Sequence, residues 1–275
     1  MRKRILAGAL AIAGLGMAMP AAATTFVVTP NSNTSSPGTN NANSPFGAAG
    51  TSTMYVMQVQ YAASLFSNVT VGSKITQIGF RLAPGSTTNS KALSYTNFGV
   101  QIGSAAKAIG SLAKSFSANM GADTITARTG ALSFAKNALK VDACTTSRCK
   151  PKVLTNSFFM IDLTNPYTYN GGDLVITLSS TLAASTVGQI VTLDAVDPYL
   201  INTVSTNANN TSSGTMPTSG LAVNFFFAPI MQFAFEAPAA AATVPEPASW
   251  AMMLGGFGLL GTAMRGQRRR AQVRA

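Results

Sequence analysis

Residues 54–61 read MYVMQVQY, and this stretch decides the fold class of the chain. Its odd-numbered positions carry Tyr, Met, Val and Tyr, while Gln58 and Gln60 occupy even-numbered ones. Successive side chains of a strand point to opposite faces, so the apolar set falls on one side and the two glutamines on the other. Such loose alternation, rich in β-branched and aromatic residues, is typical of a β-strand that packs one face on a core.

The same pattern recurs along most of the chain. Short runs rich in Val, Ile, Thr and Phe are separated by turn residues such as Pro84-Gly85. This spacing predicts an all-β domain, a β-sandwich or jelly roll, over residues 53–240. The expected strands are Met54–Tyr61, Lys74–Leu82, Phe98–Ile102, Asn156–Leu163, Asp173–Leu178, Gln189–Leu193 and Ala222–Phe235.

Two segments depart from this pattern. Residues 24–52 are rich in Asn, Ser, Thr, Pro and Gly, which predicts a mostly irregular leading segment with one strand at Phe26–Thr29. Ala105–Met120 is the one plausible helix, and its Ser and Gly content makes it a weak one.

The composition excludes several kinds of chemistry. The chain has no histidine and only two cysteines, which removes Ser-His-Asp triads, imidazole general bases and four-cysteine metal sites. The net charge of +11 sits mostly at the two ends, because residues 24–243 carry 11 Lys or Arg against 7 Asp or Glu. A nucleic-acid-binding domain carries its excess on the folded surface. We therefore expect no nucleic-acid partner, no cofactor and no enzymatic activity.

The first 23 residues predict a secretory signal peptide. Arg2-Lys3-Arg4 forms a positively charged start, and an apolar stretch follows over Ile5–Met19. Small residues then occupy the two positions that signal peptidase reads, Ala21 and Ala23. Cleavage after Ala23 would leave the rest of the chain outside the cytoplasm.

The C-terminal end contains three consecutive parts. A Pro-Glu-Pro comes first and is rigid and extended, because each proline fixes its own φ. Residues 248–264 form an uncharged apolar run of 17 residues, which as a transmembrane helix would reach about 26 Å. A basic tail over residues 265–275 is expected to stay in the cytoplasm by the positive-inside rule. The residues that carry the first and third parts are Val244, Pro245, Glu246 and Pro247, and Arg265, Arg268, Arg269 and Arg270.

This order over residues 244–270 resembles the PEP-CTERM sorting signal of proteins exported by Gram-negative bacteria. The resemblance implies a precursor held transiently in the inner membrane, processing by an exosortase-type enzyme near the Pro-Glu-Pro, and delivery to the cell surface or beyond. The same segment is also catalogued as an ice-binding protein C-terminal domain, a label for the tail alone. Gln60–Phe66, Ile75–Arg81 and Phe159–Tyr169 are similar to one group of PEP-CTERM proteins of unassigned function, which implies a β-sandwich.

Cys144 and Cys149 predict a disulfide at a loop tip, because an exported chain passes through an oxidising compartment. A redox-active pair is the alternative, although the four intervening residues do not fit C-x-x-C. Asp194 and Asp197 are the closest carboxylates, and a solvated turn, a calcium site and a glycosidase pair all fit their spacing. The solvated turn is the preferred interpretation.

Tyr167 and Tyr169 leave a further alternative open. Their rings could form a sugar-stacking platform or cover the edge of the core, and we prefer the second interpretation. Taken together, the sequence predicts a non-enzymatic surface or matrix protein with a structural or interaction role, linked to exopolysaccharide or biofilm. The alternatives are a calcium-dependent carbohydrate-binding module and a carboxylate-only glycosidase.

Overall fold

A computed structural model describes residues 23–43, 45–46, 54–86, 89–140, 157–186, 191–196, 203–210, 222–223, 228–238, 252–261 and 265. For residues 203–210 and 222–223 it describes the backbone alone. The chain divides into two units, residues 1–238 and 239–275. The described residues of the first unit are all-β, as the sequence predicts, apart from short 3₁₀ turns at Asn31–Asn33, Ala63–Phe66, Ser117–Asn119 and Ala184–Thr186.

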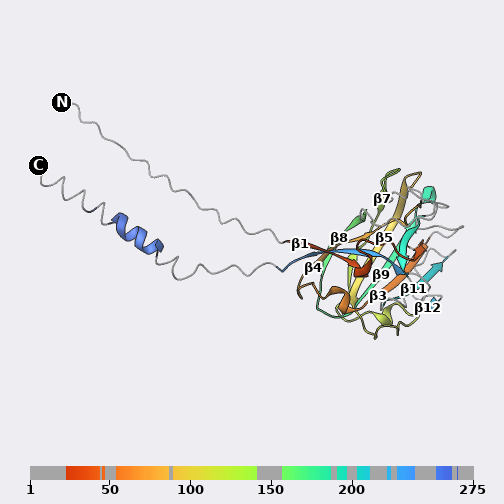
Figure 1. Cartoon of the computed structure of the whole chain (residues 1–275), viewed down its shortest axis with the longest axis horizontal. Helices are drawn as coiled ribbons and strands as arrows, with labels where there is room; N and C mark the ends of the chain where they lie inside the picture. Colours follow the sequence, from red (N-terminus) through yellow and green to blue (C-terminus); the bar gives the residue numbers. More distant parts are fainter. Residues whose placement is uncertain are drawn as a thin grey trace, which may run out of the picture. The chain divides into compact units, whose positions relative to one another are not determined.

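Sheet A contains four antiparallel strands and includes both ends of the β domain (Figure 1). The first strand of the domain pairs with the last along its whole length, from Thr24 opposite Glu236 to Thr29 opposite Met231. One further bond closes the end of this pair, because the Ala237 N–H donates to Ala23 O at 3.3 Å. The strands in spatial order are β1 (Thr24–Thr29), β14 (Met231–Glu236), β4 (Lys74–Phe80) and β8 (Phe159–Thr168).

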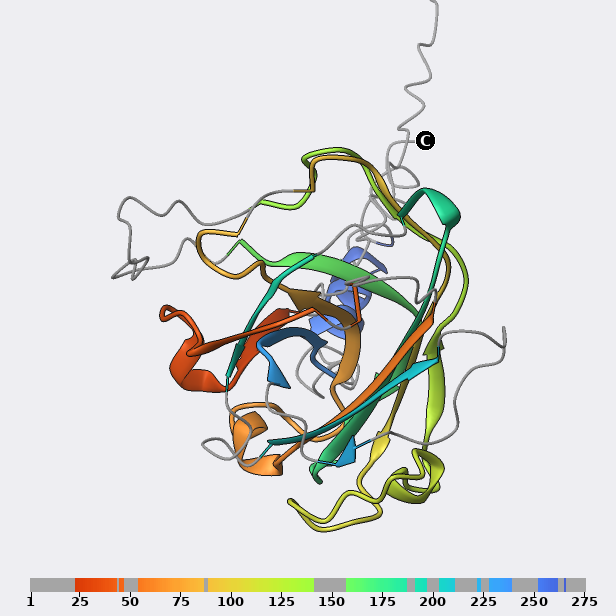
Figure 2. The same ribbon diagram turned by 90° about the vertical axis from the view of Figure 1, so that its right-hand side faces the viewer.

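Sheet C faces sheet A across the core (Figure 2). It is the larger sheet, and its central strands β3, β9 and β5 pair over most of their lengths. Its strands in spatial order are β12 (Ala222–Val223), β11 (Thr203–Asn210), β3 (Met54–Tyr61), β9 (Leu174–Leu182), β5 (Leu93–Ser104) and β6 (Ile125–Arg128), and β7 (Leu132–Phe134) also pairs with β5.

The small sheet B lies where β4 ends. It contains β13 (Ala228–Pro229), β10 (Leu193–Val196) and β2 (Asn40–Ala42). An isolated bridge joins Leu82, just after β4, to Leu193 at the start of β10. Because of this bridge, the chain passes from sheet A into contact with sheet B without a long connection.

One hydrophobic core is shared by the two large sheets. Met57 of β3 and Ile176 of β9 enter it from sheet C, while Ile78 of β4 and Phe233 of β14 enter it from sheet A. All four side chains are fully buried. The described residues of the β domain therefore form two layers around one core, the arrangement that gives an antiparallel sheet its buried face.

Phe46 lies at the centre of an aromatic cluster in this core. Its ring stacks on Phe98 at 5.2 Å and meets Phe80 and Phe159 edge-on at 5.0 and 5.4 Å. Aromatic pairs with such geometry contribute about 0.5–1.5 kcal/mol each beyond the apolar area they bury. The segment that carries Phe46 is thus part of the fold. The strand expected at Phe26–Thr29 lies within β1, and a second short strand in residues 24–52, β2, was not predicted.

The segment Ala105–Met120 forms no α-helix, so the helix prediction is wrong. The segment lies over the outer face of sheet C and is held there by Asn119. Asn119 Nδ2 donates to Gln58 Oε1 at 2.6 Å and to Ala113 O at 2.8 Å, and its Oδ1 accepts from Ala113 N–H at 2.7 Å. Side-chain bonds of this kind compete with helix formation. Gln58 Nε2 also donates to Phe116 O, so the polar face of β3 is buried too.

The predicted strands agree with the structure in most places. Met54–Tyr61 matches β3, Lys74–Leu82 contains β4, and Phe98–Ile102 lies within β5. The other expected strands overlap β8, β9, β10 and β12 to β14. Strands β2, β6, β7 and β11 were not predicted from the sequence.

Candidate functional site

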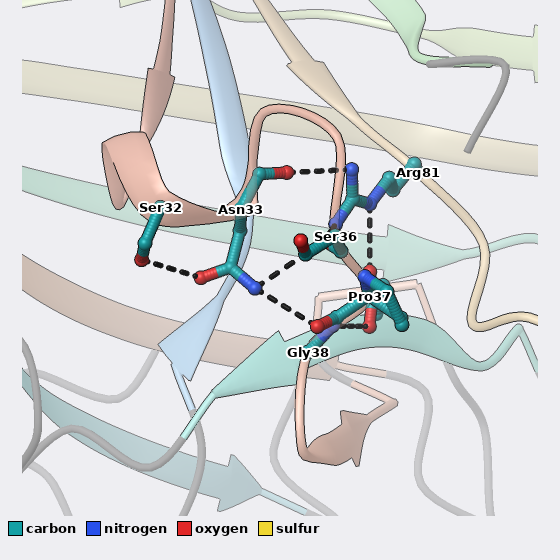
Figure 3. Close-up of polar contacts among 7 residues, drawn as sticks. Ser32, Asn33, Ser36, Pro37, Gly38 and Arg81 are labelled. Atoms are coloured by element: carbon teal, nitrogen blue, oxygen red, sulfur yellow. Dashed lines mark hydrogen bonds and ion pairs between the residues drawn. The ribbon is translucent and has the colours of Figure 1, made fainter. Parts of the chain in front are cut away.

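Arg81 lies in a polar network with the segment that carries Asn33, Ser36 and Gly38 (Figure 3). Asp194 is buried in the same network. Arg81 Nε donates to Asp194 Oδ2 at 2.6 Å, and each side chain is 1% exposed. Arg81 Nη1 donates to Asn33 O at 2.9 Å and Nη2 to Ser36 O at 2.6 Å. The Gly38 N–H donates to Asp194 Oδ1 at 2.9 Å. The network therefore ties the segment between β1 and β2 to the chain after β4 and to β10.

The expectation that Asp194 belongs to a solvated turn is wrong. Burial raises the pKa of Asp194, and the adjacent Arg81 charge and the N–H donors oppose that rise. One carboxylate oxygen is taken by Arg81 and the other by Gly38 N–H, so this side chain is a structural ion-pair partner. Asp197 lies outside the described residues. Within the described ranges, no three or more Asp, Glu or Cys side chains gather as a metal ion would need.

Tyr167 and Tyr169 cover the edge of the core, which confirms the preferred interpretation. Both are 2% exposed. The Tyr169 ring packs on Phe66 at 5.5 Å and on Phe235 at 6.0 Å. The Tyr167 hydroxyl donates to Asp123 Oδ2 at 2.6 Å, and burial together with this bond raises the pKa of Tyr167. A sugar-stacking platform needs an exposed ring face, which neither tyrosine offers.

A pocket of about 370 Å³ lies on the outer face of sheet C. Its floor includes Gly99 of β5 and Ser179 of β9, which are partners in the strand register. A Cβ added at Gly99 would lie 2.5 Å from Ser179 Oγ, so glycine at this position leaves the space above the two strands unfilled. Phe116, from the segment that covers sheet C, contributes an apolar wall, while β6 contributes Thr126 and Arg128. This hollow combines an apolar wall, hydroxyl groups and one positive charge.

The second unit contains a helix over residues 252–261. Large apolar side chains of this helix, among them Met252, Leu254 and Phe257, are exposed. No helix within the described residues has the length and hydropathy that a membrane span requires. The described part also includes Arg265, whereas Val244, the Pro-Glu-Pro at 245–247 and Arg268, Arg269 and Arg270 lie outside it.

A comparison with protein families matches residues 243–270 to the PEP-CTERM protein-sorting motif. The chain carries a PEP-CTERM protein-sorting motif. The match covers about a tenth of the chain and contains the Pro-Glu-Pro, the apolar run and the arginine cluster. A search of curated proteins and a search of solved structures found no match to the chain. The PEP-CTERM motif implies export, processing by an exosortase and a location at the cell surface or outside the cell.

Other predicted positions of the chain lie outside the described residues. Ala21 and the rest of residues 1–22 are among them, and Ala23 directly precedes β1. Cys144 and Cys149 are outside as well, so their disulfide stays a prediction.

Two arginines of the β domain were not predicted as site residues from the sequence, in which they count only as dispersed positive charges. Arg81 follows the apolar run of β4, and a charge at the end of a buried strand needs a buried partner. That position was the available signal for Arg81. Arg128 had no comparable signal, because its surroundings are assembled from four strands and a distant loop.

Proposed function

We propose that this protein is an exported, exosortase-sorted component of the cell surface or extracellular matrix, in which a non-enzymatic β-sandwich serves a structural or interaction role linked to exopolysaccharide or biofilm. The observation that carries the proposal is the PEP-CTERM motif at residues 243–270. A dedicated sorting signal at the end of a chain supports a destination outside the cell, and the β domain is then the part that acts there.

The chemistry around the motif supports a membrane-held precursor. Residues 248–264 contain no charged side chain, and the described helix within them exposes large apolar groups. Arginines follow directly, which favours a cytoplasmic position for that end. In this proposal signal peptidase removes residues 1–23, and an exosortase later acts near Glu246.

The composition of the β domain supports a role other than catalysis. Residues 24–243 have no histidine and seven carboxylates. Of these, Asp194 is bound to Arg81, and Asp123 accepts hydrogen bonds from Tyr167 and Ser104. Carboxylates engaged in this way are structural partners, and no observation favours the calcium-dependent or glycosidase alternatives.

The test follows the processing of the full chain in a bacterium that encodes an exosortase. The wild-type chain should lose its C-terminal segment and leave the inner-membrane fraction, as measured by intact mass and fractionation. A variant with Pro245→Ala, Glu246→Ala and Pro247→Ala should keep the segment and stay in the membrane. A matched variant, Pro238→Ala with Glu236→Ala, alters the same residue types upstream and should be processed normally. Equal processing of the wild type and the motif variant would falsify the sorting proposal.

A second measurement separates the alternatives for the β domain. Thermal melting with and without added Ca²⁺ should give the same midpoint if the protein works without calcium. A rise in the midpoint would favour the calcium-dependent module instead, since a ligand that binds only the folded state stabilises it. Turnover of extracted exopolysaccharide by the wild type, lost on substitution of Asp194 and Asp197, would favour the glycosidase.

A further inference from the structure

The pocket on the outer face of sheet C is built across four neighbouring strands. Val56 of β3 lies opposite Ser179 of β9, and Ser179 lies opposite Gly99 of β5. In the next row Thr177 of β9 lies opposite Gln101 of β5, which lies opposite Thr126 of β6. Short side chains in the first row leave a hollow, while the second row borders it with polar groups.

The apolar wall of the pocket is held in place by the buried polar network. Phe116 packs on Val56, and its carbonyl oxygen accepts a bond of 3.0 Å from Gln58 Nε2. Gln58 is fully buried and is itself bonded by Asn119 at 2.6 Å. A wall fixed from both sides keeps the pocket open without a ligand, and most small-molecule sites are formed in advance in this way.

Arg128 supplies the charge of the pocket. Its Nη2 donates to Ala131 O at 2.7 Å, which fixes the guanidinium, but its buried Nε has no hydrogen-bond partner among the residues that the structure describes. Among the described residues, the one ion pair is that of Arg81 with Asp194, so Arg128 has no carboxylate partner there. None of the described residues that line the pocket is acidic. A buried donor on a charged group without an acceptor favours an anion as the missing partner.

Hydroxyl and amide groups next to Arg128 are also free to bind. Gln101 and Thr126 are exposed partners in the strand register, and neither side chain makes a hydrogen bond within the described part of the protein. Ser117 lines the same pocket next to Phe116, and its hydroxyl shares a hydrogen bond of 3.2 Å with the Ser115 hydroxyl. Such a set, beside an apolar wall, matches a ring that bears several hydroxyl groups and one apolar face.

We propose that this pocket binds an acidic sugar unit, whose carboxylate pairs with Arg128 and whose hydroxyls bond Gln101 and Thr126. A volume of about 370 Å³ admits one or two sugar rings and lies at the lower end of the range of small-ligand sites. The inference deepens the proposed function and rests on it, because a location outside the cell is where the protein would meet such a sugar. It names the class of saccharide that the β domain recognises.

The test uses the purified full chain in detergent micelles and measures binding of glucuronate, glucose and acetate by saturation-transfer NMR and calorimetry. Glucuronate should bind, while glucose and acetate should bind at least about tenfold more weakly. Glucose lacks the carboxylate that pairs with Arg128, and acetate lacks the ring and its hydroxyls. Arg128→Gln should weaken glucuronate at least about tenfold, and Thr126→Val should weaken it by a smaller factor. Lys74→Gln removes an exposed charge on sheet A and should leave binding unchanged.

Each contrary result overturns a stated part of the proposal. Absence of glucuronate binding, or equal binding by Arg128→Gln, overturns the site. If acetate binds as tightly as glucuronate, the proposed recognition of the sugar ring is wrong and the pocket binds only the carboxylate. Unchanged melting of Thr126→Val shows that its effect on binding does not come from misfolding. The purified chain is assayed whether or not it is sorted, so failure here and failure of the sorting experiment are distinguishable.

Discussion

Replacing Arg81 by methionine should destabilise the β domain more than any change of a surface charge. The substitution keeps most of the apolar stem but leaves the Asp194 carboxylate at 1% exposure without its cation, and two backbone oxygens lose their donor. Removing one partner of a buried ion pair costs about 3–5 kcal/mol. With total stabilities of about 5–15 kcal/mol, such a loss is a large fraction of the free energy of unfolding.

Urea unfolding of the full chain in mild detergent, followed by far-UV circular dichroism, measures this loss of unfolding free energy. In a separate thermal melt the midpoint should fall by roughly 6–20 °C, since about 1 kcal/mol shifts it by about 2–4 °C in a domain of this size. Lys74→Met is the matched control, because it removes an exposed charge from the strand that precedes Arg81 and should cost under about 0.5 kcal/mol.

A double substitution tests the cause. Arg81→Met combined with Asp194→Asn removes the uncompensated charge, so the two changes should be less than additive by about 1–3 kcal/mol. If Arg81→Met costs less than about 1 kcal/mol, or if the two effects simply add, the ion pair does not hold these segments together and the reasoning is refuted.

Two further predictions concern the polar contacts around sheet C. Asn119→Ala should lower the free energy of unfolding by about 1–3 kcal/mol, because it leaves buried Gln58 Oε1 without its donor. In hydrogen-exchange measurements the amides of residues 105–120 should exchange faster, while those of β3 stay protected. Uniform protection in the variant would contradict this. Burial raises the pKa of Asp123, but hydrogen bonds from Ser104 and Tyr167 outweigh it and lower the pKa overall. The folded-state pKa is therefore below the unfolded one, and Asp123 stabilises the fold above about pH 4, an effect lost as the pH falls further. Urea midpoints at about pH 6 and about pH 3 should differ more for the wild type than for Asp123→Asn, and equal differences would contradict the assignment.

Local pattern predicted most strands, and long-range pairing explains what it missed. Met54–Tyr61 matches because alternation of large apolar residues is a local signal. Strand β11 reads TVSTNANN and has little apolar character, so only its backbone pairing with β3 makes it a strand. Phe46 stands alone among polar residues and turn formers, and its place in the core depends on partners far along the chain.

The candidate sites divide in the same way. The sorting motif is continuous in sequence and could be identified without coordinates. The Arg81–Asp194 pair joins residues 113 positions apart, and the Arg128 pocket depends on the order of strands across sheet C. Neither leaves a local trace, because register and strand order are set by packing of the whole domain.

The pairing of β1 with β14 has a mechanical consequence for the proposed precursor, which its C-terminal segment would hold in the membrane. A pull on that end reaches the domain at Glu236, the last residue of β14. Strand β14 is an interior strand, held by β1 on one side and β4 on the other, so both hydrogen-bonded ladders resist its withdrawal together. Strand β1 pairs with β14 along its whole length and acts as a brace. A chain pulled at this end therefore resists traction, where an edge strand would peel away.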